Sequence, residues 1–178
     1  MTDVIVETTS GKLRGTITNS IQKFVGIPYG GPTGGQQRFR PPTRPQPWPG
    51  VRDALQYGNR SPQPADGMAG LRAIIGEAQP EPDSEDCLYL NVWTPAVGDG
   101  GKRPVLFWCH GGGFTMGSGS APFYHGTNLA RRGDVVVVTV NHRLGPLGYC
   151  YLGDLAGEAY AESGNVGMLD LIAALEWV

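Results

Sequence analysis

The chain has 178 residues, 40% of them hydrophobic, which is enough for one ordinary domain with a hydrophobic core. Its 14 basic and 16 acidic residues leave a net charge of -2, and the arginines stand in small dispersed groups, which argues against a nucleic-acid partner. The 28 glycines and 15 prolines indicate that much of the chain forms turns and loops, and loops of that extent commonly hold a site.

The N-terminal segment, Met1 to Glu7, has no basic start and no continuous apolar run, so it does not resemble a secretory signal. The longest strongly apolar stretch, Val135 to Val140, is far shorter than the roughly 20 residues of a membrane span. Cys87, Cys109 and Cys150 are widely spaced without a C-x-x-C pair, which argues against a disulfide framework and a zinc site. We expect a cytoplasmic protein without membrane contact or metal, whose three free thiols are mostly buried.

Short β-prone runs open the chain, at Val4 to Glu7, Lys12 to Thr18 and Gln22 to Gly26, and turn residues separate them. This spacing predicts a small antiparallel meander. Prolines recur densely from Ile27 to Gly50, which predicts an irregular loop, and a second loop follows from Asn59 to Ser84.

The middle of the chain has the pattern of an α/β protein. Cys87 to Trp93 alternates like a strand with two different faces. Val105 to Cys109 and Val135 to Val140 lack alternation, which predicts parallel strands buried on both faces. Thr127 to Arg132 can form a short helix between them, so we expect a βαβ crossover.

The last segment predicts a buried helix that starts at an Asn165 cap. No glycine, proline or basic turn ends it before Val178, so we expect the chain to stop inside an element. The apolar residues that recur at helical spacing are Met168, Leu171, Ile172, Leu175 and Val178.

Three glycines follow the strand that ends at Cys109, in the order His110-Gly111-Gly112-Gly113-Phe114. Without Cβ atoms, such a turn can present backbone N–H groups to an open pocket and bind a developing oxyanion. A triple glycine is also typical of a merely flexible turn. A nucleotide site is disfavoured, because neither G-x-G-x-x-G nor G-x-x-x-x-G-K-[ST] occurs there.

Five segments in order resemble the type-B carboxylesterase and cholinesterase family of α/β hydrolases. The octet Ser84 to Asn91, Ser-Glu-Asp-Cys-Leu-Tyr-Leu-Asn, is the most diagnostic, and the matches cover nearly the whole chain. The segments are Phe24 to Tyr29, Arg38 to Pro42, Ser84 to Val92, His110 to Phe114 with Gly117, and Val138 to Gly145 followed by Gly164-Asn165.

The resemblance implies that residues 1–178 are the N-terminal part of a single α/β-hydrolase domain, with a small antiparallel meander followed by the first strands of the central mixed sheet. It implies that Gly112 and Gly113 supply two oxyanion-hole amides, while a residue after a serine further along the family's chain supplies the third. His110, Gly111 and Phe114 are expected to support this loop.

The resemblance also implies a buried ion pair between Arg38 and Glu85, although residue type alone favours solvated surface for both. The family commonly pairs the cysteine at the position of Cys87 with an upstream one. Positions 59 to 66 contain no cysteine, so we expect Cys87 to be unpaired. Where many relatives have Asp-Gln, this chain has Asp170-Leu171, which we interpret as core variation.

A nucleophile is not expected within these residues, since no serine has glycines two positions away on both sides. Ser118 and Ser120 are expected to form a lid or pocket wall. His125 and His142 lie in predicted connections without a serine or cysteine partner, so structural roles are favoured. The chain ends before the family's nucleophile elbow, acid and histidine.

The leading hypothesis is the N-terminal part of a carboxylesterase that hydrolyses uncharged small-molecule carboxylic esters without a cofactor or metal, active only with its C-terminal remainder as partner. In the family's sheet order the missing strand pairs with Val105 to Cys109, so the chain alone is expected to expose an apolar edge and to be insoluble or oligomeric. The alternatives are a non-catalytic cholinesterase-like interaction module and a truncated, inactive remnant.

Overall fold

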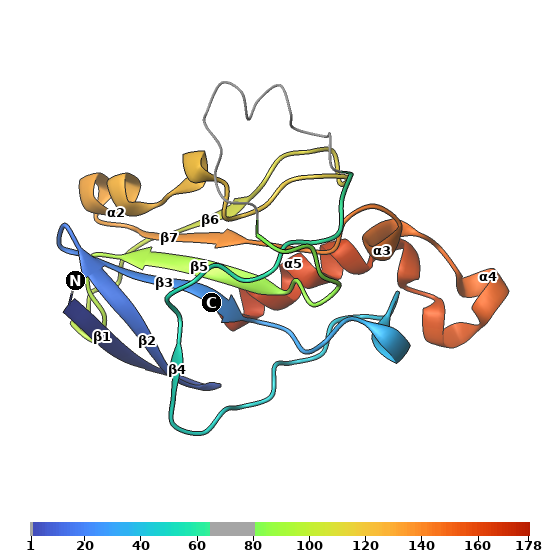
Figure 1. Ribbon diagram of the computed structural model, residues 1–178, viewed down its shortest axis with the longest axis horizontal. Coiled ribbons are helices and arrows are strands. Elements are labelled where there is room, and N and C mark those ends of the chain that lie inside the picture. The colour runs from blue at the N-terminus through green and yellow to red at the C-terminus, as the bar shows by residue number, and fades with distance from the viewer. Residues whose placement is uncertain (1, 65–80) are drawn as a thin grey trace.

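A computed structural model describes residues 2–64 and 81–178. Its main feature is a mixed seven-stranded sheet in the order β1-β2-β3-β5-β7-β6, with β4 paired to β2 (Figure 1). The strands are β1 (Thr2–Thr8), β2 (Gly11–Thr18), β3 (Ile21–Pro28), β4 (Val51–Asp53), β5 (Tyr89–Thr94), β6 (Val105–Cys109) and β7 (Val136–Val140).

The predicted antiparallel meander is confirmed by β1, β2 and β3. Asn19 and Ser20 turn the chain between β2 and β3 with φ of 51° and 63°, the left-handed geometry of a two-residue hairpin turn. The meander is continuous with the main sheet, because β3 pairs with β5 across a register shift between Phe24 and Ile27.

The predicted βαβ crossover is also confirmed. Strands β6 and β7 are parallel and adjacent, and helix α2 (Thr127–Gly133) connects them. Ala130 of α2 packs with Trp93 and Val137 on one face of the sheet. Val138 and Val140 of β7 belong to the cluster on the other face, because neighbouring strand residues point to opposite sides.

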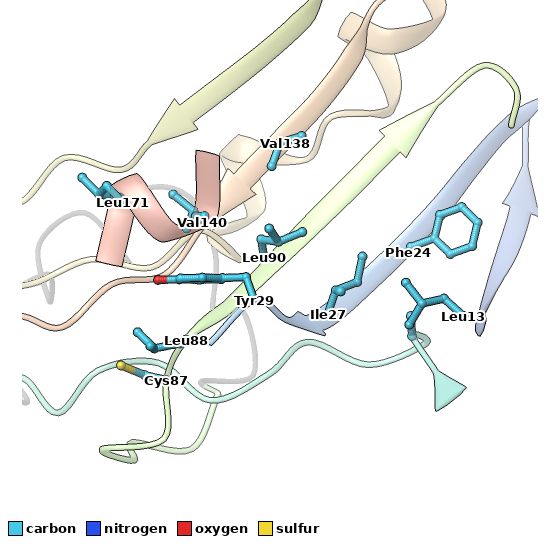
Figure 2. Close-up of a cluster of buried hydrophobic side chains, with 12 residues drawn as sticks. Leu13, Phe24, Ile27, Tyr29, Cys87, Leu88, Leu90, Val138, Val140 and Leu171 are labelled. Carbon is cyan, nitrogen blue, oxygen red and sulfur yellow. The ribbon is translucent and has the colours of Figure 1, made fainter. Parts of the chain in front are cut away.

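That second cluster is the larger core and is drawn in Figure 2. Leu171 and Ala174 of helix α5 (Val166–Trp177) cover strand residues there, so the sheet lies between α2 and α5. The other short elements are α3 (Gly145–Tyr149), α4 (Gly153–Ala156), and the 3-10 turns Gly35–Gln37, Pro122–Tyr124, Glu158–Tyr160 and Ser163–Asn165.

The proline-rich stretch from 27 to 50 is irregular as predicted, apart from the end of β3 and one 3-10 turn. The second predicted loop, 59 to 84, includes residues 65–80, which lie outside the described part of the chain. Within that part, none of the helices is long and apolar enough to cross a membrane.

The predicted burial of β6 on both faces is wrong. Val105, Leu106 and Trp108 are 49%, 37% and 41% exposed, because β6 is the last strand of the sheet and pairs only with β7. The edge position of β6 is the one that the family resemblance implied, and β7 shows the expected burial on both faces.

The predicted buried helix is only partly correct. Helix α5 follows Asn165 as expected, although the Asn165 side chain makes no capping hydrogen bond. Met168, Ile172 and Leu175 are exposed, whereas Leu171 is buried. One side of α5 therefore faces the core and the other remains uncovered.

The cysteines are free, as predicted, but they are not mostly buried. Cys87 is fully buried, Cys150 is intermediate, and Cys109 is exposed because it ends the uncovered strand β6. Cys87 being unpaired agrees with the sequence-based expectation.

Candidate functional site

Residues His110–Gly117, which we call the glycine loop, follow directly after β6 and run over the sheet's carboxyl edge. Gly112, Gly113 and Gly117 have φ of 129°, 62° and 117°, a region that glycine adopts readily. A Cβ on Gly112 would collide with the Met116 carbonyl oxygen, so this position admits only glycine without a shift of the loop.

Two carbonyls within the glycine loop are held by hydrogen bonds. His110 Nδ1 lies 2.9 Å from the Gly111 oxygen, and the Gly112 oxygen accepts the N–H groups of Thr115 (3.2 Å) and Met116 (3.3 Å). All peptide bonds described are trans, so each carbonyl points opposite to the N–H of the same peptide unit. Because these oxygens are fixed, the N–H groups of Gly112 and Gly113 point away from the groups that bond the two carbonyls.

Neither of these two N–H groups donates a hydrogen bond to any residue in the described ranges. Gly113 is exposed and Gly112 is half-buried, so neither residue is sealed inside the protein. Adjacent, oriented N–H donors of this kind can bind an oxygen that carries developing negative charge. The loop thus has the chemistry of an anion receptor.

His110 itself is buried beneath the loop, and its ring stacks on His142 with centroids 4.9 Å apart and an angle of 15° between the planes. Burial lowers the pKa of His110, while burial and the neighbouring His110 lower the pKa of His142 to about 4. Both rings are therefore neutral near pH 7. Since a carbonyl can only accept, each ring carries its proton on Nδ1, His110 toward Gly111 and His142 toward the Arg143 oxygen at 3.0 Å.

Two side-chain amides attach the end of the glycine loop and the residues directly after it to other segments. Gln63 accepts the Gly117 N–H through Oε1 (2.8 Å) and donates Nε2 to the Gly117 oxygen (2.9 Å). Asn141 Oδ1 accepts the N–H of Gly119 at 2.7 Å, and its Nδ2 donates to the Asn59 oxygen at 2.9 Å. Gln63 thus holds the last residue of the glycine loop, and Asn141, directly after β7, holds the chain two residues further on.

The predicted loop residues lie together: His110 beneath, Gly111 to Gly113 at the surface, and Phe114 exposed with its ring against Tyr149 (5.1 Å). Gly145 at the start of α3 donates its N–H to the Phe114 oxygen at 2.7 Å, which ties the end of the loop to α3.

Arg38 and Glu85 form the predicted pair, but its predicted burial is wrong. Arg38 Nε lies 2.6 Å from Glu85 Oε2, yet the two side chains are 44% and 28% exposed. The guanidinium hydrogen bond lowers the pKa of the Glu85 carboxyl. The pair lies at the surface because the proline-rich loop that carries Arg38 runs outside the sheet (Figure 1).

The buried ion pair joins Arg143 and Asp170, which sequence reasoning missed. Arg143 Nη2 and Nε lie 2.6 and 2.9 Å from the two carboxylate oxygens, and the side chains are 2% and 0% exposed. The Arg143 N–H donates to the same carboxylate at 3.0 Å. Asp170 is a charged residue among apolar neighbours in helix α5, and a charge that helix packing buries calls for a partner.

The other polar candidates have structural surroundings. Ser118 and Ser120 are buried, and Ser118 Oγ accepts the Ser120 N–H at 3.0 Å. His125 lies against Trp93, with ring centroids 5.3 Å apart. The described residues contain no group of three His, Cys, Asp or Glu side chains that could hold a metal ion.

The sheet and its crossover define a class of fold that solved esterases share. A carboxylesterase of Geobacillus stearothermophilus superposes with a TM-score of 0.87 at 49% identity, covering 98% of this chain and 33% of that one. A PNB esterase structure gives a TM-score of 0.88 at 45% identity, covering 98% of this chain and 34% of that chain. The chain thus forms the N-terminal portion of an α/β-hydrolase fold.

The family follows from the sequence comparison. The chain belongs to the carboxylesterase family, whose model matches residues 2–178. It is 46% identical over 178 residues to para-nitrobenzyl esterase of Bacillus subtilis, covering 100% of this chain and 35% of that protein. It is 43% identical to phenmedipham hydrolase of Pseudarthrobacter oxydans, covering 100% of this chain and 34% of that protein. The chain spans about a third of the length of these relatives.

Proposed function

We propose that the glycine loop is the oxyanion hole of a serine carboxylesterase that hydrolyses uncharged carboxylic esters. In this proposal the N–H groups of Gly112 and Gly113 bind the substrate's carbonyl oxygen as a serine attacks the carbonyl carbon. Negative charge moves onto that oxygen in the tetrahedral intermediate, and each preorganised donor contributes roughly 3 kcal/mol to its stabilisation. Loss of the alcohol leaves an acyl-enzyme, which water then hydrolyses.

One observation carries the proposal: two neighbouring N–H groups lack a partner in the described residues, while the carbonyls of their own peptide units are held in place. A loose glycine turn would leave both the carbonyls and the N–H groups free to rotate. Two adjacent donors that are held in one direction and have no partner among the described residues suit an oxygen that becomes negative during the reaction.

The nucleophile is proposed to lie in the part of the protein that corresponds to the remaining two thirds of the relatives. None of the serines among the 178 residues stands in a G-x-S-x-G sequence. Activity therefore requires that C-terminal remainder, and the proposed reaction uses only protein groups and water, with no cofactor or metal. The three free thiols support a reducing, cytoplasmic location.

The test is a hybrid esterase, in which residues 1–178 of this chain are joined to the part of the Bacillus subtilis para-nitrobenzyl esterase that follows its matching N-terminal third. We expect the hybrid esterase to hydrolyse nitrophenyl acetate and to react covalently with a fluorophosphonate probe. The C-terminal part alone is the control and is expected to be inactive. A folded hybrid esterase without hydrolysis would contradict the proposal and favour a non-catalytic module.

The 178-residue chain by itself gives a second arm of the same test. We expect it neither to hydrolyse nitrophenyl acetate above background nor to be labelled by the fluorophosphonate. Labelling of this chain would show that it carries a nucleophile of its own, and the peptide that bears the label would identify it.

A further inference from the structure

We propose that His142 is a positioning residue of the oxyanion hole, acting through the ring of His110 on the Gly112 N–H. This inference rests on the proposed function and adds to it a residue outside the glycine loop. The structural basis is the stack of the two imidazoles beneath the loop, with centroids 4.9 Å apart and planes 15° from parallel.

The first link joins His110 to the Gly112 N–H. His110 Nδ1–H donates to the Gly111 oxygen at 2.9 Å, and that oxygen shares a peptide unit with the Gly112 N–H. In a trans unit the two groups point in opposite directions, so the imidazole sets the direction of the donor. Glycines on both sides of this peptide unit allow it to turn over readily when the bond is lost.

The second link is the orientation of the His110 ring. Rotation about the Cβ–Cγ bond of histidine is soft, and it would carry Nδ1 away from the Gly111 oxygen. The face of the ring is held by His142, and Gly117 lies against its Nδ1 edge so closely that a Cβ there would collide with it. Gln63 in turn holds Gly117 through both of its backbone polar groups.

The third link is the rigidity of His142. It is the second residue after β7, stands between two anchored residues, Asn141 and Arg143, and is 4% exposed. Its Nδ1–H donates to the Arg143 oxygen at 3.0 Å, and the Tyr149 hydroxyl lies 3.4 Å from the same nitrogen. The low pKa of both imidazoles keeps the stack uncharged near pH 7, so the rings do not repel each other.

The test compares His142→Ala with His142→Phe in the hybrid esterase, because phenylalanine keeps a flat ring that can stack. We expect His142→Ala to lower kcat for nitrophenyl acetate roughly 10- to 100-fold, since one misdirected donor stabilises the transition state less. KM should change less than about twofold, because the ground-state carbonyl uses the donors weakly. His142→Phe should stay within about threefold of the parent kcat, and His125→Ala, at the exposed histidine, should leave kcat unchanged.

A parental kcat in His142→Ala would overturn the positioning role, as would equal losses in the alanine and phenylalanine variants. If His142→Ala does not fold, His142→Leu fills the space without a flat ring and gives the same comparison: a kcat equal to that of His142→Phe would overturn the role.

A second measurement does not depend on activity, so it separates failure of this inference from failure of the proposed function. Crystal structures of the hybrid esterase and its His142→Ala variant should show the Gly111–Gly112 peptide turned in the variant alone. An unchanged peptide in His142→Ala would overturn the positioning role even if the parent is an esterase. An inactive parent whose peptide turns as expected would overturn only the proposed function.

Discussion

Residues Asn141–Leu144, which we call the anchor segment, lie in contact with the glycine loop. The two segments differ in how many of their polar groups are hydrogen-bonded. In the anchor segment most polar groups are paired: the Asn141 oxygen accepts the Tyr29 hydroxyl at 2.6 Å, and the Leu144 N–H donates to Ser61 Oγ at 3.0 Å. In the glycine loop, the N–H groups of Gly112 and Gly113 have no partner among the described residues. The comparison indicates that the two open donors stay oriented because a neighbouring segment with most of its polar groups bonded supports the loop.

The largest expected effect comes from breaking the anchor segment at its ion pair. Asp170→Ala leaves the Arg143 guanidinium buried without its carboxylate, which should lower the free energy of unfolding of the hybrid esterase by about 3–5 kcal/mol. Asp53→Ala is the control, because Asp53 pairs with Arg14 at the surface, and it should cost less than about 0.5 kcal/mol. Urea unfolding measures both, and equal effects would show that the ion pair does not anchor this segment.

The second prediction concerns acid. The pKa of His142 is about 4 in the folded protein against 6.5 for a free imidazole, so the unfolded chain binds the proton first as the pH falls. The stability that His142 contributes is complete above pH 6.5 and is lost as the pH falls to about 4. With about 1.4 kcal/mol per pKa unit, the loss amounts to about 3 kcal/mol.

Urea unfolding of the hybrid esterase at several pH values measures the slope of the unfolding free energy against pH. His110 and Tyr149 contact the imidazole, the ion pair of Arg143 with Asp170 follows it in the chain, and all four residues are the same in the parent and in His142→Phe. His142→Phe should therefore remove the part of the slope between pH 6.5 and 4 that belongs to His142. If the pH dependence of the unfolding free energy is unchanged in His142→Phe, a group other than His142 takes up the proton.

The smallest predicted effect comes from the other brace of the glycine loop. Gln63→Leu keeps the size of the side chain but removes both hydrogen bonds to Gly117, which should cost about 1–2 kcal/mol of unfolding free energy. We expect kcat of the hybrid esterase to fall less than in His142→Ala, because the stack on His142 remains. A larger loss of kcat in Gln63→Leu would make Gln63, and not His142, the main support of the loop.

The sequence predicted those parts of the fold that depend on local pattern. The two-residue turn at Asn19-Ser20 marks the meander, and the apolar run of β7 marks a strand buried on both faces. The burial of β6 and α5 depends on the segments that pack against them. The sequences of β6 and α5 alone do not identify those segments. Both elements are apolar, yet Trp108 and Ile172 are exposed in this chain.

The candidate site also has a part that local sequence predicts and a part that depends on tertiary contacts. Gly112, Gly113 and His110 could be located because the glycine motif is contiguous and resembles a known family. The stack on His142 joins residues 32 positions apart, and the ion pair joins Arg143 to Asp170 on a different helix. Such contacts depend on the tertiary fold, although a charged residue on the inner side of α5 was a usable signal.

The most direct test of the oxyanion hole removes a donor without adding a side chain. Replacing the backbone amide of Gly113 by an ester in the hybrid esterase deletes the N–H and keeps a carbonyl at Gly112 that can accept from Thr115 and Met116. The same change at Gly98, an exposed glycine with a similar φ of 69°, is the control. The account predicts a roughly 100- to 1,000-fold lower kcat for the Gly113 ester and an unchanged kcat for the Gly98 ester. A Gly113 ester that keeps the parental kcat would contradict it.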